Sequence, residues 1–299
     1  MSTFASTSPT CACKGIRFCA SCINSERVKN LTSENVNQNF TDYQTYVFNP
    51  ADQKCYSSPN LSTNSSVTDI QKHSEWLQQQ SPDALTNIES FQINGLLILD
   101  NFLSEEEEEK LVKDIELTPW ALSQSGRRKQ DYGPKVNFKH KKVKCDRFIG
   151  VPEYADQLLK RMSEKSNGVL SSYQPFELCN LEYEPSRLSA IELHQDDMWI
   201  WGNRLISLNL LSDSVMTYEN SKLKKIVFVF MQRRFLLSMF DEARYQWRHG
   251  IFSHHIIGRR IALTMREPAK AFQVGGELYE KYGKELIERG NVRIPSVLN

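Results

Sequence analysis

The feature that most constrains the fold is a set of four polar residues, His194, Asp196, His249 and Arg260, in the C-terminal part of the chain. On a β-strand, side chains two residues apart point to the same side, so His194 and Asp196 can face one point in space. Two imidazoles and one carboxylate on one face of an Fe(II) ion leave the opposite positions open. The fold must therefore bring a distant histidine beside the strand that carries His194.

His249 is the preferred third ligand, because only a short connection separates it from the strand of Arg260. His254 and His255 are nearer to Arg260 in sequence and are the alternatives. Asp197 is out of phase with Asp196 on a strand, which assigns the carboxylate ligand to Asp196. A His-x-Asp pair alone occurs often by chance, whereas the ordered set of ligands and arginines is far more specific.

Segment 260–266 predicts a strand with two different faces. One face is polar or small, and its members are Arg260, Ala262, Thr264 and Arg266. The other face is apolar and can enter the core. Two guanidinium groups would flank a slot that suits a dicarboxylate such as 2-oxoglutarate, because arginine binds a carboxylate through two parallel hydrogen bonds. These residues predict an Fe(II)- and 2-oxoglutarate-dependent dioxygenase that consumes O2.

The size and charge of the chain limit its partners. It has 299 residues and a formal net charge of +1, enough for one large domain with an appendage or two modest domains. So small a charge gives no overall attraction to nucleic acid or membranes. No apolar run is long enough to span a bilayer, and the start of the chain lacks the apolar core of a signal peptide. We expect a cytoplasmic and nuclear protein without a membrane partner.

The pattern along the chain predicts three regions: a Cys-rich segment at 1–24, a low-complexity linker at 25–89 and a folded domain at 90–299. The linker is rich in Ser, Asn, Gln and Thr, with a single helical turn at 74–77. In the domain, Ser104 and Glu107 form a capping box at a helix start. Further helices are expected at 153–162 and 275–287.

Short apolar runs in the domain indicate strands. They lie at 96–99, 178–183, 190–195, 205–211, 226–230, 235–240 and 261–265. Several short strands in succession predict a sandwich or jelly roll, and the helices before them would pack against one sheet. The expected fold class is therefore α+β.

Four of the seven cysteines, Cys11, Cys13, Cys19 and Cys22, are spaced C-x-C-x5-C-x2-C. In a reducing compartment such a cluster is more often a metal site than a disulfide knot. Four thiolates suit tetrahedral zinc. The alternative is four free thiols on an unstructured tail.

Three further segments carry a resemblance to a known family. They are Cys11–Arg17, Ser123–Phe138 and Trp199–Gly202, and they accompany the triad and the arginine pair separated by five residues. With them, the chain resembles the AlkB-type Fe(II)/2-oxoglutarate dioxygenases over 11–24 and 90–290. The resemblance implies a double-stranded β-helix core that removes N-methyl groups oxidatively, with formaldehyde, succinate and CO2 as products.

The resemblance also implies roles for single residues. His194, Asp196 and His249 match the iron ligands, while Arg260 and Arg266 match the arginine that binds 2-oxoglutarate and its partner. Tyr183 resembles a tyrosine near the cosubstrate; without the family it would be a plain strand aromatic. The family often has an asparagine two residues before this tyrosine, where this chain has Leu181 and carries Asn180 one position earlier.

Segment 123–145 resembles the substrate lid of the family. It holds eight basic residues and one acid, and its candidate lid residues are Arg127, Arg128, Lys129 and Tyr132. Basic residues attract phosphates and aromatic rings stack on bases, but an acidic protein surface would be attracted equally well. The alternative is a solvated basic loop.

The family suggests two substrate classes: methylated lysine in protein, notably actin or actomyosin, and N6-methyladenine in DNA. The sequence leaves both open. Two other functions compete with demethylation, namely a zinc-bearing adaptor with an inactive oxygenase fold and a hydroxylase of protein side chains.

Overall fold

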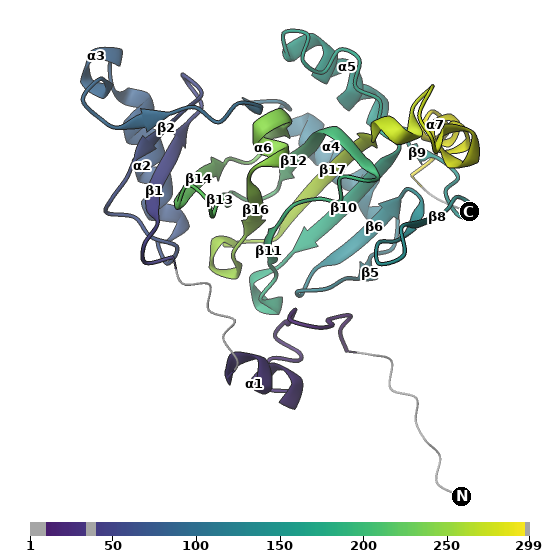
Figure 1. Cartoon of the computed structure of the whole chain (residues 1–299), viewed down its shortest axis with the longest axis horizontal. Helices are drawn as coiled ribbons and strands as arrows, with labels where there is room; N and C mark the ends of the chain where they lie inside the picture. Colours follow the sequence, from purple (N-terminus) through teal and green to yellow (C-terminus); the bar gives the residue numbers. More distant parts are fainter. Residues whose placement is uncertain (1–9, 34–39, 297–299) are drawn as a thin grey trace, which may run out of the picture.

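In the computed structural model, which describes residues 10–33 and 40–296, two large β-sheets pack face to face (Figure 1). The first sheet is ordered β11 (Ile191–His194), β16 (Arg248–Ile251), β13 (Ser214–Asn220), β14 (Lys225–Met231), β1 (Gln44–Asn49), β2 (Lys54–Ser57) and β3 (Ser90–Phe91). The second is ordered β4 (Leu96–Leu99), β15 (Leu236–Met239), β12 (Trp201–Leu210), β17 (Arg260–Pro268), β10 (Glu177–Tyr183), β6 (Arg128–Tyr132) and β5 (Ala121–Leu122).

Smaller elements surround these sheets. Two short pairs complete the described strands, β7 (Lys135–Asn137) with β8 (Lys142–Lys144), and β9 (Val151–Pro152) with β18 (Arg293–Ile294). The α-helices are α1 (Glu26–Ser33), α2 (Val67–Gln79), α3 (Pro82–Leu85), α4 (Glu105–Glu116), α5 (Ala155–Lys165), α6 (Asp241–Tyr245) and α7 (Lys284–Gly290). None of the helices in the described ranges has the length and apolar character needed to cross a bilayer.

The inner faces of the two sheets form one core. Met216 and Ile251 from the first sheet and Leu205, Met239 and Ala262 from the second line a shared cavity. Strand alternation produces this arrangement, because every second side chain turns inward toward the opposite sheet. The α+β class and the jelly-roll core, the double-stranded β-helix, are confirmed.

The expected helices and strands are found with shifted ends. α4 begins at the capping box of Ser104 and Glu107, and α5 covers the helix expected at 153–162. The helix expected at 275–287 is a π-turn at Tyr279–Gly283 that runs into α7. Strand β13, which the sequence did not indicate, joins β16 to β14 and completes the first sheet.

The sequence predicted a low-complexity linker at 25–89. This prediction is wrong for most of the residues that the structure describes in that range. β1 pairs with β14 in parallel, from Gln44 opposite Lys225 to Val47 opposite Phe228, and β2 pairs with β1. Helix α2 then covers this part of the sheet with its buried residues Val67, Ile70, Ser74 and Leu77, spaced for one helical face. The folded domain therefore begins before residue 90, while residues 34–39 lie outside the described part.

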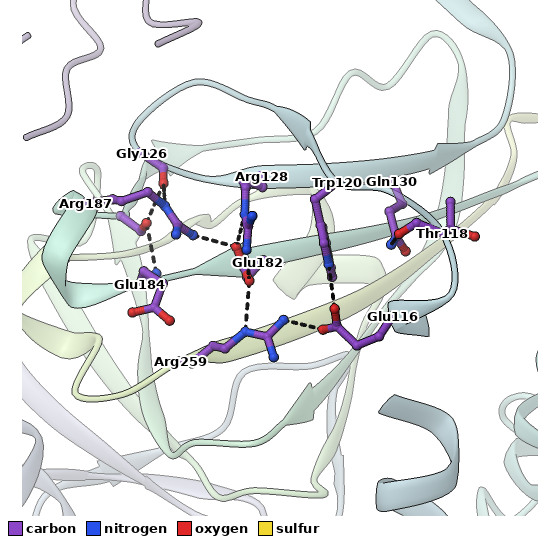
Figure 2. A network of polar contacts seen from close by, with 11 residues as sticks. Glu116, Thr118, Trp120, Gly126, Arg128, Gln130, Glu182, Glu184, Arg187 and Arg259 are labelled. Atoms are coloured by element: carbon purple, nitrogen blue, oxygen red, sulfur yellow. Dashed lines mark hydrogen bonds and ion pairs between the residues drawn. The ribbon is translucent and has the colours of Figure 1, made fainter. Parts of the chain in front are cut away.

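A buried carboxylate ties the outer face of the second sheet together. Glu182 on β10 accepts hydrogen bonds from three arginines, Arg128, Arg187 and Arg259, and Arg259 also pairs with Glu116 at the end of α4 (Figure 2). Burial opposes ionisation of Glu182, but these arginines outweigh it and lower its pKa to about 2. The side chain is therefore charged at neutral pH and joins β6, β10, β17 and α4.

We predict that Ile70→Ala reduces the free energy of unfolding by about 2–5 kcal/mol, because it leaves a cavity between α2 and the first sheet. Ile70 is fully buried, with 0% of its surface exposed. Gln79→Ala at the exposed end of the same helix is the control, with a change within about 0.5 kcal/mol. Denaturant titration measures both. Equal stability of the two variants would mean that residues 67–79 are a linker and do not pack on the first sheet.

Candidate active site

The first sheet brings the three candidate metal ligands together. β11 and β16 pair with His194 opposite His249, and Asp196 lies two residues beyond the end of β11. Asp196 Oδ2 lies 3.9 Å from His194 Nε2 and 3.5 Å from His249 Nε2. Atoms that bind one ion at about 2.0–2.2 Å can be at most about 4.4 Å apart, so these distances allow a shared metal. His194 is part exposed, which leaves one side of the site open.

The surroundings keep these ligands in the forms that bind a cation. Burial, with the nearby His194 as a second cause, lowers the pKa of His249 to about 3, so its imidazole is neutral. For Asp196, burial raises the pKa, but Arg266 and the two histidines outweigh it and hold the pKa well below its usual range. A neutral imidazole and an ionised carboxylate are the metal-binding states.

Neighbouring groups orient each ligand. Arg266 Nε donates to Asp196 Oδ1 at 2.9 Å, and Arg266 Nη1 donates to Glu177 Oε2 at 2.8 Å. The Nδ1 atom of His194 lies 2.8 Å from the backbone oxygen of Glu192, which leaves Nε2 for a metal. Arg266 was expected to flank the dicarboxylate slot, but here it binds two carboxylates of the protein and holds the metal ligand.

Arg260 lies in the cavity between the sheets, with 1% of its surface exposed. Its Nε donates to Asn209 Oδ1 at 2.5 Å, and its guanidinium lies 4.9 Å from the centre of the Tyr183 ring. Both Nη atoms are buried without a hydrogen-bond partner. Because an unpaired buried cation is costly, two free donors in a cavity shared with the triad fit the far carboxylate of 2-oxoglutarate.

The floor of this cavity matches the alternation expected for 260–266. Ala262 and Thr264 line it between Arg260 and Arg266. Leu181 lines it as well and offers no polar atom where the family often has an asparagine. Asn180 points to the other face of β10, where its amide donates to Gln130 and Tyr154 at 2.8 Å each.

The four candidate lid residues lie in or next to β6. Arg128 binds Glu182, and Tyr132 is buried, so both are structural. Arg127 is buried with its guanidinium 5.8 Å from the Tyr183 ring, which places it on the rim of the cavity. Lys129 pairs with Asp131. The exposed basic residues of this region are on the β7–β8 hairpin instead: Lys135, Lys139, Lys141, Lys142 and Lys144.

The two alternative histidines do not approach the triad. His254 is exposed, and His255 is buried with its Nε2 3.0 Å from the backbone oxygen of Ser65. Trp199 and Trp201 line an open pocket of about 1040 Å3 beside the site, together with Lys141 from the hairpin. The guanidinium carbon of Arg266 lies 5.5 Å from the centre of the Trp201 ring, so Trp201 links this pocket to the arginine that holds Asp196.

The structure also gathers the four N-terminal cysteines. The sulfur atoms of Cys11, Cys13, Cys19 and Cys22 all lie within 4.8 Å of one another, and those of Cys19 and Cys22 are 3.8 Å apart. Thiolates at about 2.3 Å from a tetrahedral zinc are separated by about 3.8 Å. The donor set and its spacing therefore fit zinc.

Comparison with known proteins agrees with this geometry. A Caenorhabditis elegans protein described as a DNA N6-methyl adenine demethylase is 55% identical over 290 residues, which cover 97% of each chain. Human alpha-ketoglutarate-dependent dioxygenase alkB homolog 4 is 40% identical over 228 residues, 66% of this chain and 74% of the human protein. The chain belongs to the AlkB family of 2-oxoglutarate-dependent dioxygenases.

Two other comparisons add little to this AlkB-family assignment. Among solved structures, that of OsALKBH1 covers 59% of this chain and 100% of its own, with a TM-score of 0.45 and 15% identity. No protein-family model matches the chain.

Sequence reasoning missed three residues that complete the AlkB-type site. Asn209 is buried on β12 and fixes Arg260, and its own amide is held by backbone oxygens including those of Met231 and Gln232. Arg244 donates to the backbone oxygen of Asp196 at 2.9 Å, and Glu192 orients His194. A polar residue inside an apolar strand run was the signal available for Asn209.

We predict that Asn209→Ala weakens 2-oxoglutarate binding about 10-fold or more, because Arg260 loses the group that orients it. Metal binding should be unchanged, since Asn209 does not touch the triad. Asn203→Ala is the matched control on the same strand, where Asn203 bonds to Asp241. Calorimetric titration of metal-loaded protein with 2-oxoglutarate measures the effect, and wild-type affinity in Asn209→Ala would remove this residue from the anchor.

Proposed function

We propose that this protein is an Fe(II)- and 2-oxoglutarate-dependent N-demethylase whose substrate is N6-methyladenine in DNA. The observation that carries the proposal is the cavity that joins a two-histidine, one-carboxylate triad to an unpaired buried arginine. The name of the C. elegans relative, which matches nearly the whole chain, supports methyladenine in DNA as the substrate.

In this proposal His194, Asp196 and His249 hold Fe(II), and Arg260 binds the far carboxylate of 2-oxoglutarate. The bound iron and oxo-acid supply oxygen activation and oxidation of the N-methyl carbon, with succinate, CO2 and formaldehyde as products. Arg266 holds Asp196 in place, and Tyr183 shields the Arg260 guanidinium from water with its ring. The apolar walls of the two sheets keep bulk water away from the cosubstrate.

Two of the acids near the site already have basic partners, which makes them less available to a cationic substrate. Asp131 is paired with Lys129, and Glu177 is paired with Arg266. A methylated lysine is a cation and would gain most from an unpaired carboxylate. N6-methyladenine is neutral and needs no countercharge, so paired acids suit it better than methyl-lysine.

The β7–β8 hairpin provides a second argument for nucleic acid. Its five exposed lysines lie on a structure that also exposes Phe138, with 48% of its surface accessible. Lys141 reaches the rim of the pocket lined by Trp199 and Trp201. Lysines that neutralise phosphates beside aromatic rings that stack on bases are the usual elements of single-strand binding.

We also propose that the four cysteines bind one structural zinc ion. Their sulfur atoms already have the spacing of a tetrahedral site, and Arg27 donates to the Cys22 sulfur at 3.4 Å. Elemental analysis of protein purified without chelators should give one zinc per chain. Absence of zinc would favour free thiols.

The decisive test compares matched substrates. We expect formaldehyde and succinate from N6-methyladenine oligonucleotides and much less from methyl-lysine peptides of actin sequence, by mass spectrometry. Asp196→Asn, which removes a ligand, should abolish turnover. Preferred turnover of the peptides would overturn the substrate proposal. A stable hydroxylated product without formaldehyde would indicate a hydroxylase, and no succinate under any condition would indicate an adaptor.

Removal of positive charge from the β7–β8 hairpin should weaken DNA binding more than it slows the chemical step. We predict that Lys139→Ala with Lys142→Ala raises KM for the oligonucleotide and lowers the slope of log affinity against log salt by about 2, because two phosphate contacts are lost. The kcat should be unchanged. The control is Lys110→Ala with Lys113→Ala, which removes equal charge from the exposed side of α4. An unchanged salt slope in the hairpin variant would mean that DNA binds to another surface of the protein.

A further inference from the structure

The Cys-rich segment lies against the loops that border the active site. Figure 1 shows it below the two sheets, leading into α1. The backbone N–H of Ala20 donates to the oxygen of Arg187 at 3.1 Å, and Arg17 donates to the Gln124 side chain at 2.6 Å. We refer to residues 11–27 as the cysteine module and to residues 123–127 as the rim turn.

One of the four cysteines contacts the rim turn through its sulfur. The Cys13 sulfur lies within hydrogen-bonding reach of the backbone N–H groups of Ser125 and Gly126. A zinc ion held by Cys13 and the other three cysteines would therefore restrain the loop that contacts the rim turn.

The rim turn is held from its other side by the segment that precedes β11. Arg187 Nε and Ser189 Oγ both donate to the Gly126 oxygen, at 2.8 and 2.7 Å, and the Ala190 N–H donates to the Ser125 oxygen at 3.0 Å. Figure 2 shows Arg187 reaching Gly126 on one side and Glu182 on the other. A Cβ atom on Gly126 would lie 2.3 Å from the Arg187 oxygen, and its φ is +70°. Only glycine fits this sandwiched position.

Two chains of contacts connect the rim turn to the candidate site, one to His194 and one to Arg260. Ser125 Oγ donates to Glu192 Oε1 at 2.5 Å, and Arg17 Nε lies 3.4 Å from Glu192 Oε2. The backbone oxygen of Glu192 in turn orients His194. On the second route, Arg127 at the end of the turn stands over Tyr183, whose ring also contacts Arg260.

We propose that the cysteine module is a positioning element of the dioxygenase site: when it holds zinc, it clamps the rim turn and thereby fixes both His194 and the 2-oxoglutarate cavity. The inference rests on the proposed zinc and iron sites. It assigns positioning roles to Arg17, Ser125 and Glu192, none of which needs to touch the substrate.

The test uses the full chain loaded with Fe(II) under anaerobic conditions and titrated with 2-oxoglutarate, followed by visible absorbance. Cys22→Ser removes a zinc ligand that has no contact with the rim turn. We expect this variant to lose zinc, to bind 2-oxoglutarate about 10-fold more weakly or worse, and to exchange amide hydrogens faster at 187–194. A folded, zinc-free Cys22→Ser with wild-type affinity and exchange overturns the proposal.

Arg17→Ala tests the contact itself. It should keep zinc and weaken 2-oxoglutarate binding about two- to fivefold, because the Arg17 contacts are part exposed. Lys14→Ala, which removes a charge from an exposed position of the same loop, should leave the affinity unchanged. Equal affinities for Arg17→Ala and Lys14→Ala count against the Glu192 route.

A glycine pair gives an answer even if Cys22→Ser does not fold. Gly126→Ala displaces the rim turn with all cysteines intact, whereas Gly168→Ala imposes similar backbone strain, φ +88°, where nothing lies within 4 Å. We expect zinc in both and weaker 2-oxoglutarate binding only in Gly126→Ala; equal binding overturns the proposal. These titrations contain no methylated substrate, so failure of the demethylase proposal would show separately, as intact binding without formaldehyde. Wild-type protein without zinc would overturn the coupling itself.

Discussion

The part-buried contact between Arg266 and Asp196 is the interaction on which the site depends. It connects β17 of the second sheet to the segment that follows β11 of the first, so it joins the two sheets at the point where the metal ligands meet. An isolated carboxylate at this depth would be protonated, and the arginine keeps it charged. Glu177 shares the arginine and prevents an excess of positive charge beside the metal position.

The outer face of the second sheet has the opposite charge arrangement, with one carboxylate among several arginines. There Glu182 is the buried carboxylate, and three arginines from separate segments surround it. The same strand, β10, therefore carries Tyr183 toward the cosubstrate cavity and Glu182 toward the arginine cluster. Because neighbouring residues on a strand point in opposite directions, the cluster fixes the position of Tyr183 without contacting it.

The parts of the fold that follow from local alternation were predictable. Strand 260–266 and the His-x-Asp spacing placed Arg260, Ala262, Thr264 and Asp196 on the cavity side, where the structure has them. Strand β1 was not predictable in the same way, since its few apolar residues become buried only by pairing with β14 far along the chain. Likewise, the count of basic residues at 123–145 could not show that Arg128 meets a buried acid on another strand.

The parallel pairing of β1 with β14 has a consequence for synthesis of the chain. Gln44 cannot meet Lys225 until residue 225 has left the ribosome. Until then, β1 can pair only with the neighbouring strand β2, and its other edge at Tyr46 and Val47 stays unpaired and apolar. Such long-range contacts form slowly. Slow translation would lengthen the time for which this edge of β1 is open, and an unpaired strand edge is a site at which chains aggregate.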